Sequence, residues 1–509
     1  MLRPLRDKTH RAEFSRINSN SRPLRMEALE SKNLLAGDVI AALIGGDLYI
    51  TGDSADNSVQ IVRDVSQTSP GVGDVVVQGF FSNPTTVNGM ASQSFTVMGE
   101  VFVDFSAGGN NAAIFGDNPS FQPDPVQLPG GVSIVGGVGD EDHSFSNAEV
   151  GGDITLDDTA GGAVAFIGID DGTVVGGDFS STSLAVSSEL DVTDASVGGN
   201  VVLATESSTV DESFLGLRDS SVGNDVRHFT DAATSTTLMT GNTVGDDVLV
   251  VGGDGDDVVN LVQTTFTNVG NTIGDDLRIL TGGGADEVML ADIQVGDDLQ
   301  FRGGDGDDIF FFEPVGVTNV IGDDVYLTGG QGADEIGVED ADIGDKLRVG
   351  TGAGDDVVAI AASTVGRSAL VSLGGGLNEA SIEETAAGRA LTVLGGGTND
   401  ILIDAVTTSH FITVVTSSGD DLVTLQDVST HSALISTHGG MDEVAISESE
   451  FDYLFVLLGS GDDSLTLDNV TVDRFAFLHG GSGTDTLVDV DDASDINFEL
   501  DFAFENYSV

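Results

Sequence analysis

The chain has 509 residues, of which 84 are acidic and 18 are basic, so its formal net charge is −66. A polyanion binds positive surfaces, so this charge excludes nucleic acid as a partner and disfavours an anionic membrane. There is no cysteine, which excludes disulfides and thiolate metal sites. No apolar run approaches the ~20 residues of a membrane-spanning helix. Hydrophobic residues still make up 40% of the chain, enough for a continuous core.

Residues 1–33 are basic and polar and hold eight of the 18 basic residues, without the clean apolar stretch of a secretory signal. Residues 26–39 (MEALESKNLLAGDV) resemble the LEPR-XLL-type segment near the start of many large planctomycete surface and secreted proteins. LESK, at 29–32, stands where that segment has L-E-x-R, with lysine in place of arginine. The resemblance implies export to the cell surface, and the alternative is a non-specific leader. We therefore predict that residues 1–33 are an N-terminal export or leader segment.

Residues 34–140 are expected to form irregular N-terminal coils with a long loop. The stretch 44–62 (IGGDLYITGDSADNSVQIV) already has the form of the repeat that follows. Beyond residue 63 the insertions lengthen, and prolines cluster at Pro119, Pro123, Pro125 and Pro129.

A V/I-G-x-D/N-apolar phrase then recurs every 22 residues, or 22 plus a small insertion. Its glycines are Gly176, Gly198, Gly223, Gly245, Gly274, Gly296, Gly322, Gly344 and Gly366. A fixed period that survives insertions indicates a stack of similar coils rather than a globule.

Each coil contains short alternating segments. Residues three and five after the phrase glycine are apolar and residue four is mostly polar, as in Leu299-Gln300-Phe301, which indicates a strand with one buried face. A glycine-rich turn leads to a second such strand, and a third apolar position precedes the next phrase glycine. The same residue types recur at the same phase, so the strands should stack in parallel on their equivalents, with right-handed crossovers. The sequence predicts an all-β fold, a right-handed parallel β-solenoid (β-helix) with about 22 residues per coil.

The solenoid repeats are expected to span residues 141–495. Between about 375 and 455 the glycine phrase decays while the 22-residue phase persists. Residues 496–509 (INFELDFAFENYSV) alternate without glycine, which is typical of a capping strand that protects the last edge.

The turn between the two strands reads G-G-x-G-x-D-x-apolar, most fully at 252–259, 303–310, 329–336 and 480–487. Weaker copies carry the aspartate alone, at Asp286, Asp356, Asp400, Asp421, Asp442 and Asp463. The turn resembles the RTX, or haemolysin-type, calcium-binding nonapeptide GGxGxDxUx. That resemblance implies Ca²⁺ between stacked turns, held by the aspartates and by backbone carbonyls. RTX motifs run in tandem on two edges, whereas this chain has one copy per coil, so the resemblance covers one edge, roughly residues 252–490.

Charge supports the same prediction. Aspartates stacked at ~4.8 Å repel by ~1 kcal/mol in water and by ~3.5 kcal/mol at an effective dielectric of 20. Oxygen ligands, flexible glycine carbonyls and the absence of cysteine favour Ca²⁺ over zinc or copper. The predicted calcium ligands are Asp254, Asp257, Asp286, Asp305, Asp308, Asp334, Asp356, Asp421, Asp442, Asp463 and Asp485. The alternative is that aspartate and glycine are simply good turn residues, with carboxylates screened by salt.

Other polar groups give weaker signals. A second acidic column, which could also bind metal, contains Asp246/Asp247, Asp275/Asp276, Asp297/Asp298 and Asp323/Asp324. An outward column could form a sugar-binding or catalytic strip, or could neutralise neighbouring acids; it contains Arg227, Arg278, Gln300, Tyr326 and Arg348. The seven histidines show no metal-ligand spacing and are expected to be ordinary strand residues.

These observations predict an exported, acidic, calcium-binding β-solenoid with a structural or adhesive role at the cell surface. The expected partners are calcium ions and a cell-surface polysaccharide or protein. The alternative is a β-helix polysaccharide lyase or glycoside hydrolase that uses one long face as a substrate groove. A lyase should show a localised break in the repeat with clustered basic and acidic residues. The irregular stretch 63–140 offers only Arg63, so no catalytic residue is predicted.

Overall fold

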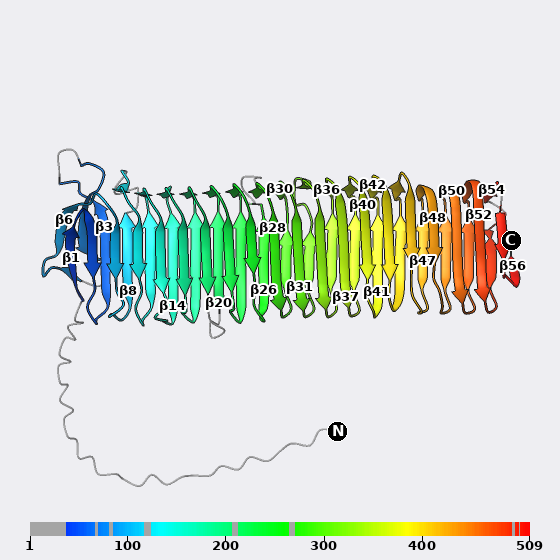
Figure 1. Cartoon of the computed structure of the whole chain (residues 1–509), viewed down its shortest axis with the longest axis horizontal. Coiled ribbons are helices and arrows are strands. Elements are labelled where there is room, and N and C mark those ends of the chain that lie inside the picture. Colours follow the sequence, from blue (N-terminus) through cyan, green and yellow to red (C-terminus); the bar gives the residue numbers. More distant parts are fainter. Residues whose placement is uncertain are drawn as a thin grey trace, which may run out of the picture. The chain divides into compact units, whose positions relative to one another are not determined.

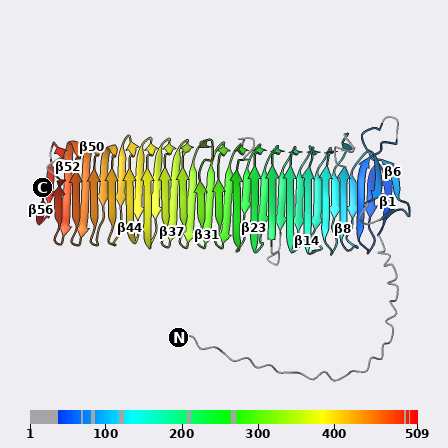
Figure 2. The ribbon, with the colours of Figure 1, turned by 180° about the vertical axis from the view of Figure 1, so that it is seen from behind.

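The computed structural model describes residues 37–66, 70–80, 85–116, 124–205, 212–263, 270–490, 494–497 and 499–508. The predicted export segment, residues 1–33, lies outside them. Residues Ala36–Val509 form one compact unit. It is an elongated stack of strands that runs from β1 at one end to β56 at the other (Figure 1), and the view from behind shows the same stack (Figure 2). This unit is all-β, a parallel β-solenoid of about 17 turns with about 22 residues per coil, which confirms the predicted fold class. The described residues include no helix that could span a membrane.

Each regular coil contributes one strand to each of three rows. In one coil these are β30 (Gln294–Val295), β31 (Leu299–Asp305) and β32 (Ile309–Phe312); in the next they are β33 (Asn319–Ile321), β34 (Val325–Gln331) and β35 (Glu335–Glu339). Equivalent strands pair in parallel, so that Phe301 lies opposite Leu327 and Phe310 lies opposite Ile336. We call the row of β31 the first row, that of β32 the second row and that of β30 the third row.

The strands that position the site lie in the coils from residue 243 onward. The first row continues with β25 (Val248–Val251), β28 (Leu277–Gly283), β37 (Lys346–Ala353), β40 (Ser368–Leu373), β43 (Ala390–Gly395) and β46 (Phe411–Val415). The second row contains β26 (Asp256–Val262), β29 (Glu287–Leu290), β38 (Val357–Ala361), β41 (Leu377–Glu383), β44 (Thr398–Asp404), β47 (Leu422–Gln426), β49 (Glu443–Ser447), β51 (Ser464–Asp468) and β53 (Thr486–Asp489). The third row contains β24 (Thr243–Val244), β27 (Thr272–Ile273), β36 (Ala341–Ile343), β39 (Thr364–Val365), β42 (Ala386–Ala387) and β45 (Thr407–Thr408).

The core lies between the three rows. The apolar positions predicted to face inward are buried in all three, as at Leu299 and Phe301 in the first row, Ile336 and Val338 in the second and Ile321 in the third. Burying this continuous strip removes apolar surface from water along the whole stack, which is the main stabilising term of such a fold.

The phrase glycines lie at a corner where successive coils approach too closely for a side chain. A Cβ added at Gly322 would lie 1.8 Å from the carbonyl oxygen of Gly296, and one at Gly344 would lie 1.9 Å from that of Gly322. The glycine period therefore follows from backbone contact between coils. In three of the four full copies of the glycine-rich turn a different requirement holds, because the glycines at motif positions two and four have positive φ, as at Gly304 (132°) and Gly306 (142°).

The ends of the solenoid differ from its middle. At the N-terminal end, β1 (Asp38–Ile44) pairs antiparallel with β2 (Asp47–Thr51), and β4 (Asp74–Gly79) pairs antiparallel with both β3 (Asn57–Arg63) and β6 (Ser92–Thr96). These antiparallel strands cover the first edge of the stack, and the sequence did not indicate them. At the other end, β55 (Glu499–Phe502) and β56 (Asn506–Ser508) continue the parallel pairing.

Candidate metal-binding carboxylate ladder

The motif aspartate lies at the start of the second-row strand, in phase with that strand's inward residues. In the coil of β32, Asp308 stands two residues before Phe310 and four before Phe312, and all three are buried. The same holds at nine of the eleven predicted calcium ligands, which are therefore inside the solenoid wall. We call these nine residues the carboxylate ladder: Asp257, Asp286, Asp308, Asp334, Asp356, Asp421, Asp442, Asp463 and Asp485.

One oxygen of each ladder aspartate caps a backbone N–H of the preceding rung. The N–H of Asp286 donates to Oδ1 of Asp308 (3.1 Å), and that of Asp308 donates to Oδ1 of Asp334 (3.0 Å). The pattern resumes near the C-terminal end, where the N–H of Asp442 donates to Asp463 (2.9 Å) and that of Asp463 to Asp485 (3.0 Å). The ladder thus satisfies turn N–H groups that would otherwise be buried and unpaired.

The other oxygen, Oδ2, accepts no hydrogen bond from any described residue in all nine ladder aspartates. It lies beneath the first glycine of the turn. A point where Gly303 would carry a Cβ is 2.1 Å from Oδ2 of Asp308 and 2.9 Å from the carbonyl oxygen of Gly329 in the next coil. The equivalent point at Gly252 is 1.8 Å from Oδ2 of Asp257 and 2.5 Å from the Thr281 carbonyl oxygen. Carboxylate and carbonyl oxygens therefore lie close together, and no donor lies at hydrogen-bonding distance of Oδ2. Weaker contacts from turn N–H groups, such as that of Gly330 to Asp334, only partly offset the effect of burial.

Two rungs in the middle of the ladder carry asparagine instead. Asn378 keeps the Oδ1 contact, accepting the N–H of Asp356 at 3.3 Å. Its Nδ2 donates to the carbonyl oxygens of Gly374 (3.3 Å) in its own turn and Gly396 (3.0 Å) in the next. At these rungs the asparagine Nδ2 donates hydrogen bonds to the turn carbonyl oxygens. At the aspartate rungs the same place is taken by Oδ2, which is itself an acceptor. The following rung is held by Asn399, so Asp400, assigned to the motif position from the sequence, is instead exposed.

Burial shifts the titration of the ladder. Desolvation, with added repulsion from neighbouring carboxylates, raises the pKa of Asp308 to about 7 and those of Asp257, Asp334 and Asp442 to about 6. Desolvation also raises the pKa of Asp463.

The remaining two predicted ligands are not in the ladder. Asp254 and Asp305 are exposed on the turn. Oδ1 of Asp305 accepts from Nε2 of Gln331 in the next coil at 2.5 Å.

In the coils directly before Asp257 the same row continues with serines, which the sequence pattern did not indicate. Ser235 lies opposite Asp257 and donates its hydroxyl to Oδ1 of that aspartate (2.6 Å), and Ser213 lies opposite Ser235. The row therefore changes from hydroxyl to carboxylate at the first full copy of the motif. The register spacing from the motif aspartate could have identified these serines.

The second acidic column is neutralised within the chain at several positions. Its aspartates also cap backbone N–H groups, as where the N–H of Asp324 donates to Oδ1 of Asp298 (3.0 Å). Their free oxygens, however, meet donors: the Tyr326 hydroxyl lies 2.6 Å from Oδ2 of Asp324, and Nζ of Lys346 lies 3.1 Å from the same oxygen. Arg278 bonds Asp276 in the same way at 2.5 Å. Three carboxylates of this column, Asp323, Asp324 and Asp345, have oxygens within 4.8 Å of one another. Lys346 lies among them, with Nζ 2.8 Å from Asp345.

A buried polar cluster lies between the second-row strand β11 (Glu141–Ser146) and the first-row strand β13 (Ile154–Asp158) in the N-terminal half. Nδ1 of His143 accepts the N–H of Ala113 (3.1 Å), so its Nε2 carries the proton and faces Oε2 of Glu141 at 3.3 Å. Burial and the Glu141 charge raise the pKa of the adjacent Asp158 to about 7. The histidine has no lone pair left for a metal. It is a buried residue of β11.

Comparisons of the chain with protein families, curated proteins and solved structures gave no match. The fold and the site therefore define the protein as an acidic parallel β-solenoid with a buried row of half-satisfied carboxylates.

Proposed function

We propose that the chain is a calcium-stabilised β-solenoid with a structural or adhesive role, exported to the cell surface. The observation that carries the proposal is the close approach of ladder Oδ2 atoms to turn carbonyl oxygens, with no donor at hydrogen-bonding distance of Oδ2. A buried carboxylate in that position has to be protonated or paired with a cation, because an isolated buried charge is strongly unfavourable.

The donor set fits Ca²⁺. Calcium takes carboxylate and backbone carbonyl oxygens in flexible geometry, and flexible glycine turns supply the second kind. The ladder aspartates and the carbonyls of the motif turns would hold the ion, which would supply the positive charge that stacked carboxylates lack. No histidine belongs to the ladder and the chain has no cysteine, so the site is unsuited to softer metals.

Two further features support the proposal. The turn resembles the RTX nonapeptide, and the segment at 26–39 resembles an export-associated motif of surface proteins. An extracellular location would expose the ladder to abundant calcium. The second acidic column needs no added ion where Lys346, Arg278 and Tyr326 already contact its carboxylates.

The test is thermal melting followed by circular dichroism in metal-free buffer, with Ca²⁺ or Mg²⁺ added at equal ionic strength. The melting temperature should rise with Ca²⁺ and far less with Mg²⁺, by mass action on the folded state. The variant Asp334→Asn should respond less to Ca²⁺, whereas Asp305→Asn, outside the ladder, should respond like the native protein. Equal responses to both ions, or to both variants, would overturn the proposal.

A further inference from the structure

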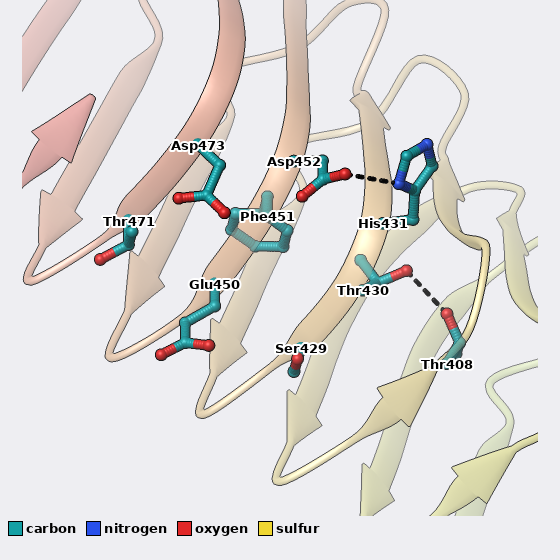
Figure 3. Close-up of a pocket in the computed structure, with 9 residues that line it drawn as sticks. All are labelled: Thr408, Ser429, Thr430, His431, Glu450, Phe451, Asp452, Thr471 and Asp473. Atoms are coloured by element: carbon teal, nitrogen blue, oxygen red, sulfur yellow. Dashed lines mark hydrogen bonds and ion pairs between the residues drawn. The ribbon is translucent and has the colours of Figure 1, made fainter. Parts of the chain in front are cut away.

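The regular coil geometry changes close to the C-terminal end of the described solenoid. Here β48 (Ser429–Ser436), β50 (Glu450–Ser460) and β52 (Thr471–Ser482) each run through the corner that holds the phrase glycine in earlier coils. The pairing of β50 with β52 shifts register between Phe451 and Tyr453. An open depression of about 400 Å³ lies at this corner, and Figure 3 shows the side chains that line it.

The depression brings together acidic, basic and hydroxyl groups. Oδ2 of Asp452 lies 2.8 Å from Nδ1 of His431 and 3.3 Å from Nε of Arg474. Glu450 and Asp473, both exposed, add carboxylates from two adjacent coils, and all three acids are visible around the same hollow in Figure 3. The site therefore offers fixed hydrogen-bond donors and acceptors side by side, with an excess of carboxylates.

Aromatic rings adjoin these polar groups on the outward face of the first row. The Tyr453 ring contacts the His431 ring edge-on, with centroids 5.3 Å apart, and Arg474 lies over its face at 5.9 Å. One step along the sheet, Phe455 packs against Phe475, with centroids 6.0 Å apart.

These rings are concentrated in the C-terminal coils. Pairing along the first row places Phe455 in the same outward column as Arg278, Gln300, Tyr326 and Arg348 of earlier coils. Beside the depression, aromatic residues thus occupy outward positions that hold mostly polar residues in earlier coils. Tyr453 and Phe455 are half-buried and do not belong to the inward-facing core.

We propose that this face, formed by β48, β50 and β52 around Tyr453 and Asp452, binds a neutral polysaccharide. Aromatic faces pack on the apolar faces of sugar rings, while carboxylate, imidazole and guanidinium groups hydrogen-bond hydroxyls. The combination extends over the three adjacent coils of β48, β50 and β52, so that successive units of one polymer could contact it. The three carboxylates and the net charge of −66 repel a polyuronate or sulfated chain, which selects an uncharged one. This inference adds a ligand and a face to the proposed adhesive role, and it does not depend on the carboxylate ladder.

The test is affinity electrophoresis of the full chain in native gels that contain hydroxyethylcellulose, galactomannan or soluble starch, with polygalacturonate as the acidic arm. Calcium is held constant, so that a failure of the metal proposal does not affect the result. We expect retardation by at least one neutral polymer and none by polygalacturonate. Tyr453→Ala and Asp452→Asn should each weaken the retardation at least tenfold. The matched control is Tyr326→Ala, an outward tyrosine of the same row that also lies against an arginine, Arg348 (5.4 Å), and it should leave the retardation unchanged.

Melting temperatures of all variants are measured alongside. If Tyr453→Ala proves unstable, Asp473→Asn, an exposed surface change, decides the matter and should weaken binding. The proposal is overturned if no neutral polymer retards the chain, if polygalacturonate retards it more strongly, or if the loss is equal in Tyr326→Ala. Binding to isolated cell envelopes that protease treatment abolishes and glycosidase treatment does not would point instead to a protein partner and would also overturn it.

Discussion

At the residue scale, the ladder aspartate has two oxygens with different surroundings. Oδ1 of Asp308 accepts a backbone N–H, and its Oδ2 faces the carbonyl side of the turn. Asn378 shows that an amide serves the first role and places a donor in the second. A charged aspartate at this rung is thus expected to stabilise the fold less than asparagine does, unless a cation or a proton lies beside Oδ2.

Two substitutions at one position separate these roles. Asp308→Asn keeps the acceptor and removes the charge, so in metal-free buffer at pH 8 it should melt at a higher temperature than the native protein. Asp308→Ala leaves the Asp286 N–H buried and unpaired, which should lower stability by about 1–3 kcal/mol. Thermal and urea unfolding measure both. A metal-free Asp308→Asn that melts below the native protein would show that the carboxylate is not strained.

Stability should depend on pH through the same groups. Burial raises the pKa of Asp308 to about 7 and that of Asp334 to about 6, against an ordinary value of 3.8. A carboxyl whose pKa is higher in the folded state binds its proton more tightly there. Its stabilising contribution is therefore complete below about pH 4 and is lost as the pH rises through 6 to 7. The metal-free melting temperature should fall between pH 5 and pH 8, and less so in Asp308→Asn. A melting temperature that rises across this window would contradict the assignment.

The turn that follows the second-row strand has one residue with left-handed backbone, and this conformation can be tested independently of the ladder. Ala362 has φ 49° and is exposed, directly after Ala361 at the end of β38. In most other coils this turn carries aspartate, glutamate, asparagine or glycine. Ala362→Gly should stabilise the protein by up to about 1 kcal/mol, because glycine adopts positive φ without steric cost. Ala361→Gly, in the strand, should destabilise it by about 0.5–1 kcal/mol. The same sign for both changes in urea unfolding would contradict this interpretation.

At the element scale, the phrase glycine sets the spacing between coils. A Cβ at Gly322 would lie 1.8 Å from the Gly296 carbonyl oxygen, whereas one at Gly350, within β37, would meet no atom within 4 Å. Gly322→Ala should therefore destabilise by about 3 kcal/mol or more, since backbone of the neighbouring coil has to move. Gly350→Ala should be nearly neutral. Comparable melting temperatures for the two variants would show that the corner is looser than the structure indicates.

The sequence predicted the elements well where the period is strict. Three strands per coil, their inward residues and nine of the ladder positions all follow from the 22-residue phase. The inward direction of the motif aspartate was also accessible, because Asp308 has the same parity as Phe310 and Phe312. It was instead expected at an edge between turns, since the motif resembles one that is known for its calcium chemistry.

Other features could not be derived from the pattern. The antiparallel strands β1, β4 and β6 depend on which partners meet at the first edge, and their alternation does not distinguish a cap from a coil. The depression beside Asp452 lies where the register shifts between Phe451 and Tyr453, and a residue count alone does not reveal that shift. The assignment of Asn399 rather than Asp400 to its rung depends on a one-residue shift, and such a shift exchanges the two faces of a strand.

At the scale of the whole molecule, a rod with a net charge of −66 repels itself along its length. Much of this charge has a local use, because aspartates in three columns cap backbone N–H groups of neighbouring turns, as where the N–H of Ala333 donates to Asp307 (2.8 Å). Exposed carboxylates are screened by salt, whereas the ladder is buried and is screened least. The buried row is therefore where a bound cation would stabilise the stack most.

The most direct measurement is anomalous diffraction from crystals grown with Ca²⁺, with data collected before and after the crystals are washed with a chelator. We predict a row of anomalous peaks beside the Oδ2 atoms between Asp257 and Asp485, with gaps at the Asn378 and Asn399 rungs. Crystals that show no peak along this row, or peaks only at the exposed cluster of Asp323, Asp324 and Asp345, would contradict it.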